Sequence, residues 1–105
     1  MSSGEWKTAT IAAGATKSDA VDLGRGYQYM NVQIPDIDSC TLNLSVAEKI
    51  GYTYRELDPS VLIPETGGLY NDTWEVDGWQ FIKIVCSKPQ TAIRTFCVRG
   101  SLWMT

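Results

Sequence analysis

Histidine is absent from this 105-residue chain. That absence removes the usual general base near neutral pH, the usual partner of a Ser or Cys nucleophile, and the commonest metal ligand. The sequence also has no glycine-rich loop before a Lys-Ser or Lys-Thr pair, and no Gly-x-Gly-x-x-Gly motif. We therefore expect a protein that is not an enzyme and that has no catalytic residues, no cofactor and no metal site.

Runs of basic residues and long apolar runs are missing as well. The nine Lys and Arg residues are scattered and the net charge is −3, so nothing favours binding along a phosphate backbone. No apolar run approaches the roughly 20 residues that span a bilayer, and residues 1–6 lack the features of a signal peptide. We expect no nucleic-acid partner, no membrane, and synthesis in a cytoplasm.

Cysteine is scarce and does not follow a metal-binding spacing. The three residues, Cys40, Cys86 and Cys97, are an odd number without a Cys-x-x-Cys pair, and each lies in an apolar or alternating stretch. This pattern predicts buried thiols. A disulfide between Cys86 and Cys97, facing each other across a hairpin, is the alternative.

Acidic residues offer only a weak signal for chemistry. Paired carboxylates can act as acid and base on a sugar, but acidic residues in turns more often cap strands. The run from Asp36 to Ser39 superficially resembles a calcium loop, yet it lacks the Gly and the distal Glu of an EF-hand and favours Asx-turns. The carboxylates considered as a catalytic pair are Asp36, Asp38, Glu65, Asp72, Glu75 and Asp77.

The strongest pattern that is present is alternation of apolar and polar residues with a period of two. Met30, Val32 and Ile34 alternate with polar neighbours, and Pro35 is expected to end that strand. Residues 40–46 repeat the pattern, and residues 80–86 form a strand that is apolar on nearly both faces. Shorter strands are predicted at 6–12, 20–23, 52–57, 69–76 and 93–98.

Turn residues separate these strands, and residues 87–91 have the length of a hairpin loop, which predicts antiparallel pairing of the last two strands. No helix suited to a βαβ crossover is present. The sequence predicts one all-β domain over residues 1–105, an antiparallel two-sheet β-sandwich, jelly-roll-like, with seven or eight short strands. A small closed barrel is the alternative, and residues 1–5 and 102–105 are expected to be ordered only against a neighbour.

Aromatic residues are frequent, with four Trp and five Tyr. Some of them fill the core, but exposed Tyr and Trp are enriched at protein interfaces and also serve as stacking platforms for sugars. Tyr29 draws attention because it lies on the polar face of its strand. The predicted interface residues are Trp6, Tyr29, Tyr52, Tyr54, Trp74 and Trp103.

Three segments carry a resemblance to a known group. Thr10 to Gly24 reads TIAAGATKSDAVDLG, an Ala-Gly turn followed by Ser-x-Ala-x-Asp-Leu-Gly, and a strand ending in Pro35 follows it. Leu42 to Ala47 is an apolar strand, and Gly78 to Lys83 reads GWQFIK. This outline resembles small virion proteins encoded by tailed bacteriophages, in which the corresponding pieces end in Ser-Ala-Asp-Gly and read Gly-Trp-x-Tyr-Ile-Lys.

The resemblance implies a β-sandwich that coats or joins parts of a phage particle, and it carries over no catalytic residues. It predicts a capsid cement or decoration protein located in the virion, with the major capsid protein or other virion proteins as partners and a homo-oligomer, a trimer, as the assembled state. A neck or tail component and a module that binds a host glycan are the alternatives. Residues 47–51 depart from the tight turn of the group, so a different connection is expected there.

Overall fold

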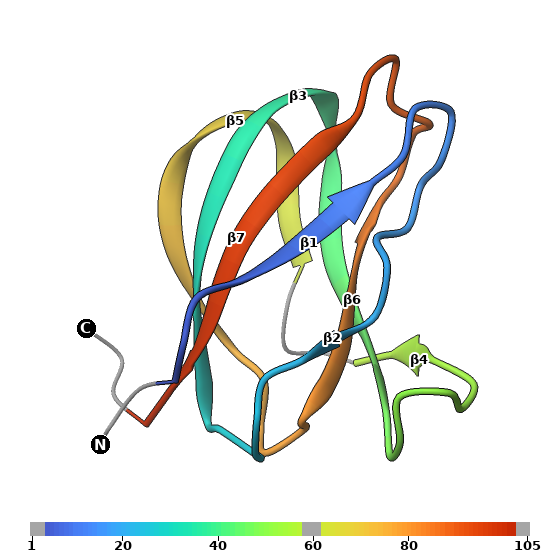
Figure 1. Cartoon of the computed structure of the whole chain (residues 1–105). Helices are drawn as coiled ribbons and strands as arrows, with labels where there is room; N and C mark the ends of the chain where they lie inside the picture. Colours follow the sequence, from blue (N-terminus) through green and yellow to red (C-terminus); the bar gives the residue numbers. More distant parts are fainter. Residues whose placement is uncertain (1–3, 58–61, 103–105) are drawn as a thin grey trace.

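The structure is a computed structural model that describes residues 4–57 and 62–102. Every regular element within those ranges is a β-strand, and none of the described residues forms a helix that could cross a membrane. Figure 1 shows seven strands curving around a common interior. They are β1 (Lys7–Ile11), β2 (Val21–Asp22), β3 (Tyr29–Ala47), β4 (Arg55–Glu56), β5 (Leu62–Glu75), β6 (Phe81–Cys86) and β7 (Arg94–Ser101).

The 19-residue strand β3 organises the sheet. One edge of β3 pairs with β7 along Tyr29–Gln33 and then with β6 along Leu42–Ala47. The opposite edge pairs with β5 and then with the short β4. All these pairings are antiparallel, so a single bent strand connects both halves of the sheet.

The chain between β1 and β2 brings the two ends of the sheet together. Ser18 bridges to Ile11 beside β1, and the Ser18 backbone N–H donates to the Ile84 carbonyl oxygen in β6 at 2.8 Å. The antiparallel sheet therefore nearly closes into a barrel. The predictions of an all-β antiparallel fold and of about seven strands are confirmed, and the arrangement is close to the barrel that the sequence left open.

Pro35 does not end its strand, so that prediction is wrong. Pairing with β7 stops at Gln33 and pairing with β6 starts at Leu42. Between these points β3 has only β5 beside it, and the missing N–H of Pro35 interrupts no ladder on the other edge. Register shifts between Asp36 and Leu42 let β3 bend and continue to Ala47.

The predicted pairing of the last two strands is also wrong. β6 pairs with β2 and with Leu42–Ala47 of β3, whereas β7 pairs with β1 and with Tyr29–Gln33 of β3, so β6 and β7 do not pair with each other. The connection of residues 87–93 therefore crosses from one side of the barrel to the other. The hairpin prediction rested on the length of the loop, which is a local signal. The strand with which both β6 and β7 pair, β3, is distant in sequence.

A buried glutamine holds this crossing loop. Gln90 Oε1 accepts from the Asp38 N–H at 2.8 Å and from Arg94 Nε at 3.2 Å. Its Nε2 group donates to the carbonyl oxygens of Lys88 at 3.3 Å and Asp38 at 3.4 Å. The carboxylate of Asp38 accepts from the Thr91 N–H at 2.7 Å and pairs with Arg94 at 3.0 Å. Asp38 thus anchors the crossing loop.

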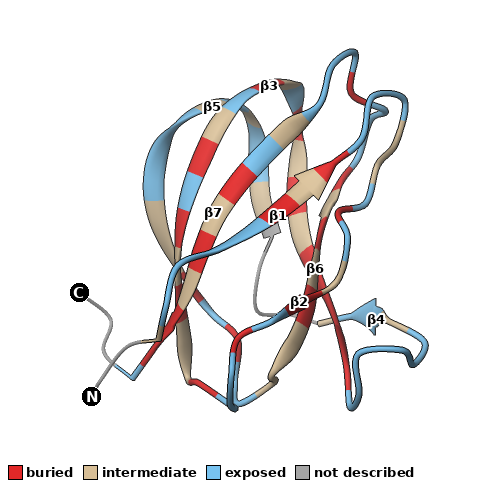
Figure 2. Cartoon of the chain, viewed as in Figure 1, coloured by how far each residue is buried: buried red, intermediate tan, exposed pale blue. Residues whose placement is uncertain are grey.

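The core is the face that the alternation predicts, and Figure 2 shows buried and exposed residues alternating along the strands. Cys40 and Cys86 are buried as predicted, but Cys97 is only half-buried. All three thiols are free, so the alternative of a Cys86–Cys97 disulfide is not realised. Burial raises the pKa of the Cys40 thiol, and the neighbouring Cys86 raises it further. The largest fully buried side chains include Phe96, Ile11, Leu23, Met30, Leu42 and Leu44.

Candidate functional site

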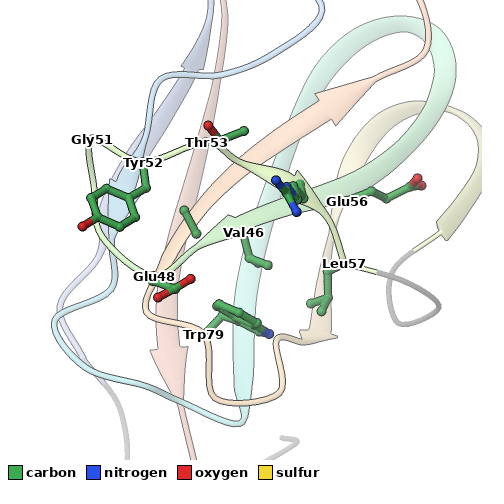
Figure 3. Close-up of a pocket in the computed structure, with 10 residues that line it drawn as sticks. Val46, Glu48, Gly51, Tyr52, Thr53, Glu56, Leu57 and Trp79 are labelled. Carbon is green, nitrogen blue, oxygen red and sulfur yellow. The ribbon is translucent and has the colours of Figure 1, made fainter.

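A hollow of about 800 Å³ lies where β3 ends and β4 returns beside it. Figure 3 shows Val46, Leu57 and Trp79 together on one side of this hollow, with Tyr52 on the other. Trp79 and Leu57 pack against the core but remain partly exposed. The complete lining is Val46, Ala47, Glu48, Gly51, Tyr52, Thr53, Arg55, Glu56, Leu57 and Trp79, called here the end hollow.

Local hydrogen bonds shape the loop of residues 48–54 that forms one wall. The Tyr52 N–H donates to the Lys49 carbonyl oxygen at 3.0 Å, which makes a turn. The Tyr54 hydroxyl donates to the Ile50 carbonyl oxygen at 2.9 Å. β4 then runs antiparallel to the end of β3, which brings Arg55 opposite Val46. The departure from a tight turn that the sequence showed at residues 47–51 is therefore the part of the chain that builds this wall.

Charged groups of both signs surround the aromatic rings. Glu48, Glu56 and Arg55 line the end hollow, and Glu56 Oε1 accepts from Asn43 Nδ2 at 2.7 Å. The Lys49 ammonium lies 5.3 Å from the centre of the Tyr52 ring. The end hollow thus offers ring faces for stacking beside donors and acceptors for hydrogen bonds.

Tyr54 ends this loop and is half-buried. The Lys83 ammonium lies 4.7 Å from the centre of its ring. Burial raises the pKa of the Tyr54 hydroxyl, and the negative charge of Asp22 raises it further. The hydroxyl therefore stays protonated and remains a donor to the loop.

Tyr52 and Tyr54 are the two predicted interface residues that the structure brings together, on one loop. Tyr52 is 53 % exposed, so its ring is available to a partner. Trp6 and Tyr29 lie elsewhere: Arg99 of β7 lies over the Trp6 ring, and Tyr29 is in β3 between Ser101 of β7 and Glu75 of β5. The predicted residues that the structure describes therefore do not form one continuous surface.

A second aromatic patch consists of Trp6, Arg99 and Asn31, and it is called here the Trp6 patch. Trp6 is 45 % exposed, and the Arg99 guanidinium lies 4.8 Å from the centre of its ring. Arg99 Nε donates to Asn31 Oδ1 at 2.9 Å, which fixes the guanidinium over the ring. Tyr29 is half-buried two residues before Asn31 on the same strand.

Trp74 was expected at an interface, and that prediction is wrong because only 3 % of the residue is exposed. Its ring joins the core, and its Nε1 group donates to Asp72 Oδ2 at 3.0 Å at the rim. An amphipathic ring with one polar atom satisfies both environments in this position. Trp103 lies outside the described residues.

The overall fold is similar to that of solved proteins. The SPBc2 prophage-derived protein YomS superposes with a TM-score of 0.54 over 90 % of this chain and 91 % of its own, at 11 % sequence identity. The IMPa metallopeptidase from Pseudomonas aeruginosa gives a TM-score of 0.49 at 14 % identity, over 96 % of this chain and 13 % of its own. No family model matches the sequence, and no curated protein matches it. At these identities the likeness to YomS shows a shared fold.

Sequence reasoning missed most of the residues around the end hollow. Trp79 was left directly before the strand predicted at residues 80–86. Arg55 and Glu56 were assigned to a predicted strand of six residues, but the strand is only two residues long. The hollow exists because the chain folds back over Trp79 after β3, and no periodic pattern reports such a return. The departure at residues 47–51 was the one local signal available. Among the described residues, no cluster of three or more metal-ligating side chains occurs.

Proposed function

We propose that this protein is a structural component of a tailed bacteriophage particle, and that it binds the capsid shell as a cement or decoration protein. The observation that carries the proposal is the presence of two separate aromatic surfaces, the end hollow and the Trp6 patch, on one domain. A protein that joins neighbouring capsid subunits needs at least two contact surfaces. Exposed Tyr and Trp beside cations are the groups that dominate such contacts.

The proposed mechanism is bridging. Tyr52 would insert between subunits on one side, and Trp6 with Arg99 would contact the next subunit on the other. Each contact is modest, but copies arranged on a symmetric lattice and assembled as a trimer would bind with high avidity. No catalytic step is part of this function.

The fold adds support of a general kind. YomS is a prophage-derived protein that shares the fold over nearly its whole length. The sequence outline described above resembles small virion proteins, and most of its strands lie in this barrel. These likenesses favour a role in a particle, and the two surfaces favour a role in joining its parts.

The test is binding to expanded capsids that lack this protein. Purified protein is incubated with the capsids, unbound protein is removed by sedimentation, and bound copies are counted by cryo-microscopy. The expected result is a copy number that matches the capsid lattice. Binding at a single vertex would assign the protein to the neck or tail, and absence of binding would reject a virion role for these surfaces.

Variants connect the binding to the two surfaces. Tyr52→Ala and Trp6→Ala each remove an exposed ring, so each should reduce occupancy while the protein keeps its fold. Ile93→Ala is the matched control, because Ile93 is an exposed apolar residue on the crossing loop that lines neither hollow. Occupancy equal to that of the wild-type protein in Tyr52→Ala and Trp6→Ala would show that the rings do not contact the shell.

A second function is favoured by the composition of the end hollow. Aromatic rings of Tyr52 and Trp79 beside Glu48, Arg55 and Glu56 form the combination that binds a sugar, with ring stacking and directional hydrogen bonds. A glycan array probed with wild-type protein and with Tyr52→Ala separates this function from capsid binding. Selective binding of one glycan class that is lost in Tyr52→Ala would assign the hollow to a host glycan.

A further inference from the structure

The outer edge of β5 is a long strand edge without a neighbour. β5 pairs with β3 and with no other strand in the described part of the chain. From Tyr70 to Glu75 the pairing with β3 is regular, opposite Tyr29 to Ile34. This stretch contains no Pro and no Lys, two residues that commonly protect strand edges. Figure 1 shows β5 as the outermost strand on its side of the barrel.

The register identifies the backbone groups that face outward. The Val76 N–H donates to the Gln28 carbonyl oxygen at 2.9 Å, so the backbone groups of Trp74, Asp72 and Tyr70 point toward β3. Those of Glu75, Thr73 and Asn71 consequently point away from the sheet.

One of these outward donors is already used within the strand. The Thr73 N–H donates to Asp72 Oδ1 at 2.8 Å. The N–H groups of Asn71 and Glu75 point away from β3, and β5 has no other strand beside it among the described residues, so both groups remain for another strand. Asn71 and Glu75 are four positions apart. This matches an antiparallel partner, because outward backbone groups recur at every second residue.

The residue at the beginning of this edge, Leu69, has a strained backbone conformation. Leu69 has a φ of 68°, which is unfavourable for a bulky residue, and its side chain is 75 % exposed. Gly68 before it also has a positive φ, and a Cβ there would overlap the Pro35 carbonyl oxygen. The backbone therefore turns the Leu69 side chain into solvent beside the free edge, where it gains nothing from the core.

Charge selects the chemistry of the partner. Residues 57–82 contain five carboxylates and no Lys or Arg. Asp72 and Glu75 lie in the regular part of the edge. A second copy of this edge would bring the same negative charges together, whereas an extended segment with Lys or Arg side chains would be attracted.

The Trp6 patch borders the same edge. A shallow hollow of about 280 Å³ is lined by Trp6, Asn31 and Gln33 together with Asn71 and Thr73 of β5. A strand added beside β5 would extend the outer face next to Trp6. An exposed aromatic ring next to a strand edge supplies side-chain contacts in addition to backbone hydrogen bonds.

We propose that the outer edge of β5 between Leu69 and Glu75 accepts an added β-strand from a basic, extended segment of a partner protein. Backbone hydrogen bonds to Asn71 and Glu75 provide the register. Leu69 and Trp6 provide apolar contacts, and Asp72 and Glu75 select Lys or Arg. This inference goes beyond the proposed capsid function because it names a different element and the chemistry of its partner.

The probe is a nine-residue capped peptide that alternates Lys and Thr, added to the ¹⁵N-labelled full chain. We expect amide shift changes confined to residues 69–75 and their neighbours on the Trp6 patch, together with slower hydrogen exchange at Asn71 and Glu75. The same peptide with Glu in place of Lys should not bind. Raising the salt concentration should weaken the binding of the Lys peptide.

Two substitutions distinguish the contribution of the backbone hydrogen bonds from that of the negative charge. Asn71→Pro removes an outward donor without touching the β3 ladder, and it should weaken the peptide about tenfold. Asn71→Thr keeps the donor and is the matched control, with binding unchanged. Glu75→Gln keeps the size of the side chain and should weaken binding about threefold.

Several results would overturn the proposal. They are absence of binding by the Lys peptide, equal binding of the Glu peptide, and shift changes that map to the end hollow instead of β5. A concentration-dependent dimer that disappears in Asn71→Pro would assign the edge to a second copy of this chain. Capsid binding measured with Asn71→Pro is separate, because loss of the peptide with normal capsid occupancy would leave the cement function intact.

Discussion

Replacement of Gln90 by Ala tests how the crossing loop is held between the two sides of the barrel. Gln90 is 1 % exposed, and its amide bonds Asp38, Lys88 and Arg94 at distances of 2.8 to 3.4 Å. Truncation leaves the Asp38 N–H and the Asp38 carbonyl oxygen without this partner, whereas the Lys88 carbonyl oxygen still accepts from Cys86 Sγ. Arg94 keeps its contact with the Asp38 carboxylate.

The expected cost follows from these groups. A buried polar group that loses its partner costs about 1–3 kcal/mol, and two such groups remain after truncation. Partial entry of water reduces the cost, so we expect the free energy of unfolding to fall by about 3 kcal/mol. For a domain of this size that corresponds to a decrease in Tm of about 15 °C.

Urea denaturation followed by tryptophan fluorescence measures this change as a lower midpoint at constant slope. Gln28→Ala is the matched control, because Gln28 bonds Glu75 at the surface and its loss should cost less than about 0.5 kcal/mol. Gln90→Met keeps the length of the side chain and should recover little of the loss. A decrease below about 1 kcal/mol in Gln90→Ala, or near-complete recovery in Gln90→Met, would refute the role of the hydrogen bonds.

Three further predictions concern single residues. Trp74→Ala should lower the free energy of unfolding by about 3–5 kcal/mol because the ring is in the core, and a urea midpoint close to wild type would show that the ring is not packed there. Leu69→Gly should raise stability by about 0.5 kcal/mol by relieving the positive φ, which calorimetry measures, and a loss of stability would mean that the exposed Leu69 side chain makes stabilising contacts. The Thr91 N–H, followed by Arg94, holds the pKa of Asp38 below its ordinary value. Asp38 therefore contributes stability above about pH 4 that is lost as the pH falls through its folded-state pKa, and the difference between wild type and Asp38→Asn in urea midpoint should shrink with it. A difference that is constant from neutral to acidic pH would contradict this reasoning.

Much of the sheet was predictable because its signal is local. Residues 30, 32 and 34 alternate with polar neighbours, and so do residues 40–46, and the apolar positions of both are buried. The strands themselves follow from this pattern, since one face meets the core and the other meets water. Their connectivity does not follow, because β6 and β7 pair with different stretches of β3, a strand that is far away in sequence.

The bend of β3 could not be predicted for a related reason. Pro35 is a strand terminator by its missing donor, but here its neighbour on that edge has already ended. Whether a proline breaks a ladder depends on which strand lies beside it, and that is a property of the fold. Trp74 shows the same limit, because its strand pattern did not reveal that its ring faces the core while its indole nitrogen reaches Asp72.

The continuity of β3 bears on the proposed function. The Trp6 patch is tied to the first part of β3 through Asn31, and the end hollow begins at Val46 near its end. A single strand connects the two surfaces, and β5 pairs with it from Tyr29 to Asn43, on both sides of the bend between Asp36 and Leu42. Two binding surfaces at a fixed separation lose less entropy on bridging two neighbours than surfaces joined by a flexible linker. A rigid strand is therefore an advantage for a protein that links neighbours on a lattice of fixed spacing. It gives no such advantage to a protein that binds one ligand in one hollow.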